Sequence, residues 1–207
     1  MDLTSFQPSM VLAIIPEIGL VVLAAVVLLL DLVFHPREKP LFGWVTAAGL
    51  TIIAVLSALF SRPGDEAQLI LGGMLRSDWA SFTFRLIFLL GATVTVLLAG
   101  DEEDGRRFGE FCTLVVVATL GMSLMASSAN LVMLYLAIET TSLPLYIMAG
   151  FRVLDQKSVE AGLKYLLYGA MTSAVMLYGF SLLWGFTGTA NIYEIAGQLQ
   201  SGGASPL

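Results

Sequence analysis

The chain has 207 residues, of which 57% are hydrophobic and only 13% are charged, and its formal net charge at pH 7 is −6. With a mean hydropathy of +0.85, this composition excludes a soluble globular domain. A single cysteine, Cys112, and a single histidine, His35, exclude an internal disulfide, a zinc site, a haem pair and an iron–sulfur cage. We therefore expect no cofactor in this chain and any redox chemistry in its neighbours.

Long uncharged stretches predict membrane spans. No charged residue lies between Lys39 and Arg62, or between Glu110 and Glu139. Runs of this length fit helices of about 20 residues that cross a bilayer. The sequence predicts an all-α membrane protein, a polytopic bundle of about six transmembrane helices within residues 1–190, at approximately 10–34, 41–60, 79–98, 111–126, 131–151 and 159–186. Residues 191–207 are polar and rich in glycine and serine, and we expect a tail or a loop leading to further helices.

The distribution of lysine and arginine predicts the orientation of the bundle. The segments after the first, third and fifth spans hold Arg37, Lys39, Arg106, Arg107, Arg152 and Lys157. The segments on the opposite side hold only Arg62 and Arg76. Because loops rich in these residues stay in the cytoplasm, the N-terminus is expected outside.

Glu139 lies in the middle of the fifth predicted span, within the otherwise apolar residues 131–150. An isolated charge at the bilayer centre costs at least roughly 2.5–3.5 kcal/mol, so such a residue needs a partner, a proton or a function. Helical spacing places Tyr135, Ser142 and Tyr146 on the same face, which makes a polar stripe. We expect the stripe to face the sixth helix. The alternative is a packing helix whose glutamate is protonated and hydrogen-bonded.

Pro144 interrupts the hydrogen bonding of the same span. It has no backbone N–H, so the carbonyl of Thr140, four residues earlier, loses its helical partner. Membrane helices tolerate this loss where hydroxyls, water or a neighbouring helix satisfy the freed group. The hydroxyls of Thr140, Thr141 and Ser142 are expected at that turn.

Lys164 lies about two turns inside the sixth predicted span, with Tyr168 on the same face. Lys164 has two competing explanations. The first is an ion pair on the helix surface with Glu160, which stands four residues earlier, the spacing favoured for such a pair. If Lys164 instead approached Glu139 to about 8 Å at an effective dielectric constant of ~20, the two would be coupled by ~2 kcal/mol. Coupling of that size suits a proton relay.

Other charged residues near span ends have simpler explanations. Arg85 is one or two turns inside the third span, where it is expected to reach the interface or pair with Asp78. Glu17 and Asp31 fit interfacial positions at the two ends of the first span, and contact with a partner subunit is the alternative.

Two motifs resemble a known family. Residues 136–146 (LAIETTSLPLY) are similar to the fifth-helix signature of the antiporter-like subunits of respiratory complex I. Residues 158–165 (SVEAGLKY) and 177–189 (LYGFSLLWGFTGT) are similar to the sixth helix. The SLPLY form, with the early Ile15-Pro16-Glu17, resembles subunit N of NADH–quinone oxidoreductase.

The resemblance implies a proton-translocating subunit without a redox site, in which Glu139 and Lys164 form the relay. It implies supporting positions at Tyr135, Ser142, Pro144, Tyr146, Glu160 and Tyr168. The partners would be the lipid bilayer and other membrane-arm subunits, including other antiporter-like subunits. Flavin and iron–sulfur clusters would lie in partner subunits and quinone in the complex, most simply in a bacterial inner membrane. Family members continue into further helices, including a broken seventh helix with another lysine, so the resemblance implies a fragment or one piece of a split subunit.

Two other functions stay open on the sequence. A subunit of a multi-subunit sodium/proton antiporter would share the fifth-helix glutamate and show sodium-dependent activity without a redox partner. In a purely structural scaffold, Glu139→Gln would change stability alone.

Overall fold

The computed structural model describes residues 8–33, 39–64, 67–99 and 107–201. Six helices within these ranges are long and apolar enough to cross a membrane, which confirms the expected all-α membrane fold. They are α1 (Pro8–Val33), α2 (Lys39–Phe60), α3 (Trp79–Ala99), α4 (Phe108–Ser127), α5 (Leu131–Ala149) and α6 (Gln156–Thr187).

Polar residues cap the starts of α5 and α6, and the cap of α6 shifts that start from the predicted position. The side chain of Asn130 accepts a hydrogen bond from the Val132 N–H at the start of α5. The side chain of Asp155 accepts one from the Lys157 N–H, so α6 begins at Gln156 rather than near residue 159. A prediction from apolar residues misses the first turn of such a helix, because the groups that cap a helix are polar. With 32 residues, α6 is about 48 Å long and exceeds the roughly 30 Å hydrocarbon core of a bilayer.

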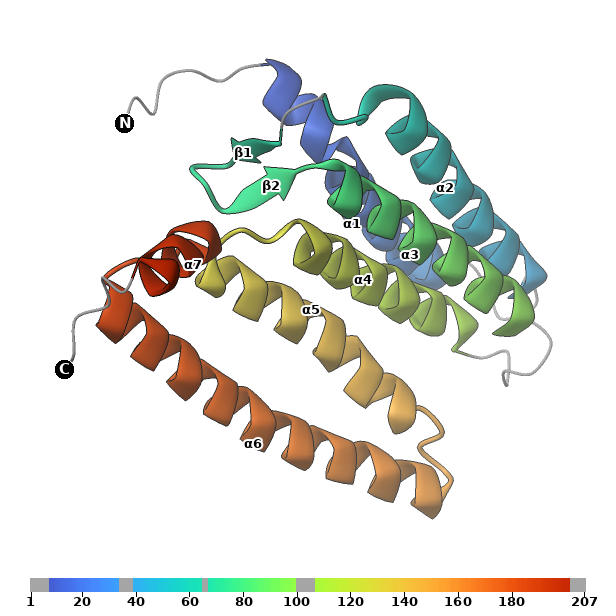
Figure 1. The fold of residues 1–207 in the computed structure, drawn as a ribbon. Coiled ribbons are helices and arrows are strands. Elements are labelled where there is room, and N and C mark those ends of the chain that lie inside the picture. The colour runs from blue at the N-terminus through green and yellow to red at the C-terminus, as the bar shows by residue number, and fades with distance from the viewer. Residues whose placement is uncertain (1–7, 34–38, 65–66, 100–106, 202–207) are drawn as a thin grey trace.

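The first four helices form a bundle, and the last two long helices extend it on one side (Figure 1). Helix α4 packs against α1, α2 and α3 as well as against α5, whereas the main helix partner of α6 is α5. The core lies within the first four helices and includes the fully buried Leu20, Leu50, Leu89, Val96 and Val116. The bundle therefore presents α5 between a packed core and the single outer helix α6.

One end of the bundle carries short elements that the six-span prediction did not contain. Strands β1 (Gln68–Ile70) and β2 (Leu75–Ser77) form an antiparallel hairpin, and a short helix α7 (Ile192–Gln200) lies beside it (Figure 1). The turn between the strands uses positive φ angles of 66° at Gly72 and 86° at Gly73, which favour glycine. We call this end of the bundle the hairpin end.

Backbone hydrogen bonds join three chain segments at the hairpin end. The Ala129 N–H, in the link between α4 and α5, donates to the Met74 carbonyl at 2.9 Å. The Ala129 carbonyl accepts from the Ile192 N–H at 2.9 Å, and the Leu131 N–H donates to the Ala190 carbonyl at 2.8 Å. Residues 191–207, expected as a polar tail or loop, thus include a helix anchored to this end, while the division of the chain near residue 190 stays a prediction.

Candidate functional site

Helix α5 presents its two opposite sides to two different helices. On one side, a Cβ at Gly121 of α4 would overlap the Thr141 hydroxyl and backbone and approach the Ala137 carbonyl. On the other side, the backbones of Gly150 and Gly162 of α6 meet, because a Cβ added at Gly150 would lie 3.4 Å from the Gly162 Cα. The absence of side chains at these glycines permits α4, α5 and α6 to approach closely.

Tyr146 is the polar-stripe residue in closest contact with α6. Its ring packs edge-on against the ring of Tyr165, with centroids 4.7 Å apart. Its hydroxyl lies over Gly169, where any Cβ would overlap it. The structure thus places this part of the stripe against the sixth helix, as the sequence predicted.

Glu139 lies on the same side of α5 as Tyr146. It precedes Tyr146 by seven residues and Gly150 by eleven, and both intervals are close to whole numbers of helical turns. The residue is half-buried, and its Oε1 is buried without a hydrogen-bond partner among the described residues. Leaving such a polar atom unsatisfied costs about 1–3 kcal/mol, more if it is charged, so the site calls for a donor such as water.

Tyr135, one turn from Glu139, lines an apolar groove between α5 and α6. The groove has a volume of about 330 Å³, and its α6 wall includes Leu177, Phe180 and Trp184. Its polar side-chain groups are the hydroxyls of Tyr135 and Ser181 and the indole N–H of Trp184. The space between α5 and α6 near Glu139 is therefore less filled than the close contact at Tyr146.

The hydroxyls around Pro144 do not satisfy the carbonyl that it frees. Thr140, Thr141 and Ser142 each donate one turn back, to the carbonyls of residues 136, 137 and 138, at 2.7, 3.0 and 2.8 Å. The three hydroxyls lie at the predicted turn but bond elsewhere, because a serine or threonine hydroxyl in a helix most readily reaches the carbonyl four residues before it. Pro144 itself is buried within a continuous α5.

Lys164 makes an ion pair with Glu160 and lies apart from Glu139. The side chains of Lys164 and Glu160 are 64% and 62% exposed in the isolated chain. Lys164 adjoins Tyr165, the contact of Tyr146, and Tyr146 is about 10 Å along the helix axis from Glu139. The contact that Lys164 makes is with Glu160, and Tyr168 is also exposed. The relay and supporting roles of these residues stay predictions.

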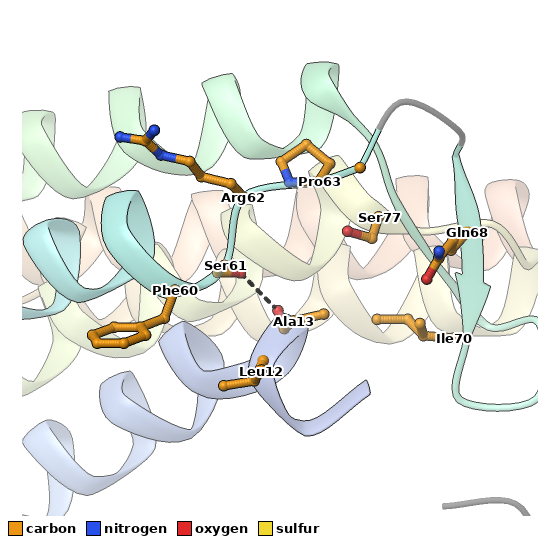
Figure 2. A pocket seen from close by; sticks show the side chains of 10 residues that line it. Leu12, Ala13, Phe60, Ser61, Arg62, Pro63, Gln68, Ile70 and Ser77 are labelled. Atoms are coloured by element: carbon orange, nitrogen blue, oxygen red, sulfur yellow. Dashed lines mark hydrogen bonds between the residues drawn. The ribbon is translucent and has the colours of Figure 1, made fainter. Parts of the chain in front are cut away.

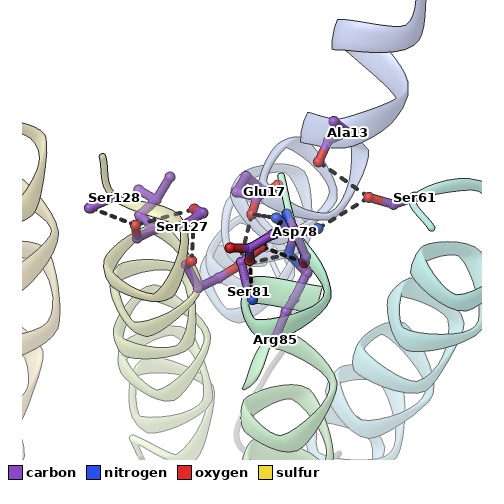
Figure 3. Close-up of polar contacts among 10 residues, drawn as sticks. Ala13, Glu17, Ser61, Asp78, Ser81, Arg85, Ser127 and Ser128 are labelled. Atoms are coloured by element: carbon purple, nitrogen blue, oxygen red, sulfur yellow. Dashed lines mark hydrogen bonds and ion pairs between the residues drawn. The ribbon is translucent and has the colours of Figure 1, made fainter. Parts of the chain in front are cut away.

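The bundle contains a buried ion pair that the sequence analysis did not identify (Figure 3). Arg85 of α3 lies with its Nη2 2.7 Å from Glu17 Oε1 of α1, and both side chains are less than one-tenth exposed. Arg85 Nε donates to Ser123 Oγ at 3.2 Å, and Ser123 Oγ donates to Glu17 Oε1 at 2.8 Å. Arg85 Nη1 donates to Ser61 Oγ at 3.1 Å.

The expectations for these two charges are therefore wrong. Arg85 neither reaches the interface nor pairs with Asp78. Asp78 Oδ2 instead lies 3.1 Å from Arg76 Nε, although that Nε–H makes no hydrogen bond among the described residues. Glu17 is buried rather than interfacial. One signal was available in the sequence: Glu17 and Arg85 have opposite charges and lie at similar depths from the N-terminal ends of the first and third spans, which cross the membrane in the same direction.

Comparison with known proteins bears on these sites. Residues 128–206 match the family model described as "NADH:quinone oxidoreductase/Mrp antiporter, TM". NADH-quinone oxidoreductase subunit N of Anaeromyxobacter sp. is 38% identical over 90% of this chain, and that of Moorella thermoacetica is 39% identical over 86%. The chain belongs to the subunit N family of antiporter-like membrane proteins. The resemblance carried by residues 136–146 and 158–165 is thereby confirmed.

Solved structures of respiratory complexes contain the same fold. The chain superposes on a chain of respiratory complex I from Thermus thermophilus with a TM-score of 0.70 and 35% identity, covering 86% of this chain and 38% of the other. An archaeal membrane-bound sulfane sulfur reductase complex gives a TM-score of 0.69 at 22% identity, over 90% and 39%, which shows the fold alone. The chain spans only 36% and 37% of its subunit N relatives from Anaeromyxobacter and Moorella.

Ionisable side chains inside the bundle are isolated or paired. Within the described ranges, no group of three or more His, Cys, Asp or Glu residues is placed to hold a metal ion. The buried ionisable groups instead occur singly, as Glu139, or as a pair, as Glu17 with Arg85. The absence of a cofactor from the chain stays a prediction.

Proposed function

We propose that this chain forms part of a proton-translocating membrane-arm subunit of a NADH–quinone oxidoreductase, in which Glu139 accepts and releases the proton. The observation that carries the proposal is the buried Oε1 of Glu139, which has no hydrogen-bond partner in the described part of the chain and lies on the side of α5 that faces α6. A carboxyl oxygen there gains a partner when it is protonated or when water reaches it. Electron transfer in neighbouring subunits, which hold flavin, iron–sulfur clusters and quinone, drives the movement.

Lys164 serves in this proposal as the charge that biases Glu139. The ion pair with Glu160 supports it, because an exposed lysine in a bilayer-facing helix needs a compensating charge. Separation of Lys164 from Glu160 would change the field at Glu139 even across more than 8 Å, since a low-dielectric membrane interior screens charge weakly. Glu160 thus competes with Glu139 for the lysine.

Glu139→Gln tests the proposal, because glutamine keeps the shape and hydrogen-bonding groups but removes the exchangeable charge. We expect the complex to assemble and its coupled proton pumping to fall strongly, measured in sealed vesicles driven by NADH. Glu194→Gln in α7 is the matched control, since Glu194 is an exposed acid at the hairpin end, and it should leave pumping unchanged. Lys164→Ala should lower pumping more than Glu160→Ala does.

Three outcomes would contradict the proposal. Pumping at the parental rate in Glu139→Gln would show that Glu139 carries no proton. Failure of that variant to assemble would show that Glu139 is needed for the structure of the complex. Equal, mild effects of Lys164→Ala and Glu160→Ala would leave only a surface ion pair, which contributes a few tenths of a kcal/mol.

A sodium/proton antiporter subunit is the second candidate, because the matching family model covers both groups of proteins. That function predicts sodium-dependent transport without NADH. Flavin and iron–sulfur proteins that co-purify with the chain in mild detergent would favour the oxidoreductase instead. For location, we propose a bacterial inner membrane with the N-terminus outside.

A further inference from the structure

A polar cavity opens at the hairpin end, away from Glu139. It has a volume of about 200 Å³ and lies between the hairpin-end parts of α1 and α2 and the β hairpin (Figure 2). Its polar lining comes from Ser61, Arg62, Gln68 and Ser77. Because a water molecule takes about 30 Å³ in the liquid, the cavity has room for several.

Ser61 connects this cavity to the buried ion pair. It lines the cavity, and its Oγ accepts the hydrogen bond from Arg85 Nη1 at 3.1 Å (Figures 2 and 3). The same hydroxyl donates to the Ala13 carbonyl at 3.3 Å. One side chain thus separates the cavity from a guanidinium group that pairs with Glu17.

Two buried oxygens near Ser61 have no partner among the described residues. Glu17 Oε2 has none, although Oε1 of the same carboxylate receives both Arg85 and Ser123. Ser57 Oγ also has none, and Ser57 lies one turn below Ser61, whose N–H donates to the Ser57 carbonyl at 3.0 Å. Native proteins satisfy such isolated buried oxygens with ordered water.

One turn deeper, the side chains from α1, α2 and α3 are apolar, and the hydroxyl of Thr119 from α4 is bound to the Val115 carbonyl. Leu20 follows Glu17 by three residues, Leu89 follows Arg85 by four, and Ile53 precedes Ser57 by four. All three side chains are buried in one hydrophobic cluster. Water entering from the hairpin end therefore meets a dry layer directly beyond the ion pair.

We propose that the hairpin end of α1–α4 holds a water-filled site that enters through the Ser61 cavity and ends at Glu17 and Arg85. Its ligand is water, hydrogen-bonded to Glu17 Oε2 and Ser57 Oγ. The site connects the ion pair to the solution on the hairpin side only, because the leucine and isoleucine layer closes the other side. It is independent of the role proposed for Glu139.

Cysteine accessibility in the assembled, full-length complex tests the site. Cysteines replace Ser57 and Ser61 in the site, Gln68 at its mouth and Leu89 in the dry layer, and a charged, membrane-impermeant thiol reagent is added to either side of sealed membranes. Ser57→Cys is the central variant, because the Ser57 hydroxyl makes no hydrogen bond among the described residues that the change would remove. The parent protein, with its buried Cys112, sets the background.

We expect Ser57→Cys and Ser61→Cys to react from the same side as Gln68→Cys. Their rates should lie within about tenfold of that control, since one or two helical turns add only about 5–11 Å of path. Leu89→Cys should stay at background. If Ser57→Cys and Ser61→Cys are as unreactive as Leu89→Cys while Gln68→Cys reacts, the site is dry and the proposal fails. Reaction from the opposite side would contradict it equally, and neither result depends on whether Glu139 carries protons.

Discussion

The Glu17–Arg85 pair shows how two charges are retained inside a membrane bundle. Removing both from water costs several kcal/mol per ion, and only close pairing with further hydrogen bonds offsets that cost. Arg85 meets this condition with three partners, on α1, at the end of α2 and on α4. The pair therefore fixes the relative positions of these elements at the hairpin end.

Removing one partner of this pair should destabilise the bundle more than removing both. Glu17→Gln leaves the Arg85 charge buried without its counter-charge, which costs about 3–5 kcal/mol. Glu17→Leu combined with Arg85→Met replaces the pair by apolar groups and should cost less. Thermal unfolding of the purified subunit complex measures both. A double variant at least as unstable as Glu17→Gln would show that the ion pair itself stabilises the bundle, and that the loss in Glu17→Gln does not come mainly from the unpaired Arg85 charge.

The sequence predicted the roles and contacts of some charged residues but not of others. Glu139 was identified because a carboxylate within a long apolar run is costly wherever the helix packs. The sequence did not reveal Glu17 as the partner of Arg85. The two residues are 68 positions apart, and spacing along one helix says nothing about contacts between helices. The pairing of Lys164 with Glu160 was among the stated alternatives, since it is a contact within one helix.

The contact between α5 and α6 depends on glycines that admit large neighbours. Gly169 of α6 receives the Tyr146 hydroxyl, whereas a Cβ at Gly179 of the same helix would meet nothing within 4 Å. Both glycines lie within a helix, where alanine is favoured by up to about 1 kcal/mol. The two positions therefore separate packing from helix propensity.

Gly169→Ala should destabilise the α5–α6 pair, and Gly179→Ala should not. The new methyl group at residue 169 overlaps the Tyr146 hydroxyl, and overpacking of this kind costs about 1–3 kcal/mol. Protease resistance of the α5–α6 segment in detergent measures the difference. Equal resistance of the two variants would mean that Tyr146 moves aside freely and does not position α5.

The long helices could be predicted from the sequence, and the short elements could not. Six helices of 19 to 32 residues each carry a long apolar run, so their positions followed from hydropathy. The three-residue strands β1 and β2 and the nine-residue α7 carry no such run. Their positions depend on hydrogen bonds between distant segments, such as that from Ala129 to Met74, which no local pattern contains.

At the scale of the whole molecule, the structure separates the bundle into two ends with different chemistry. The hairpin end carries the β hairpin, α7 and the polar cavity. Helices α3 and α5 end at the other end of the bundle, and most of the loop lysine and arginine residues follow odd-numbered helices in the sequence. From the distribution of these residues, we propose that the hairpin end faces outward and the other end faces the cytoplasm.

A cysteine at residue 105 tests this orientation. Gly105→Cys, in the charged segment 100–110, should react with an impermeant reagent only after the inner face is exposed. Gln68→Cys at the hairpin end is the control and should react in intact cells. Ready labelling of Gly105→Cys from outside would reverse the orientation and with it the side on which the cavity opens.

The central claim is that Glu139 exchanges its proton during turnover, and an infrared difference spectrum triggered by NADH in the assembled complex measures this directly. A protonated carboxyl group gives a C=O band that shifts in heavy water. We expect such a band in the parent complex, displaced in Glu139→Asp and missing in Glu139→Gln. Identical difference spectra from the parent and Glu139→Asp complexes, both turning over, would contradict the claim.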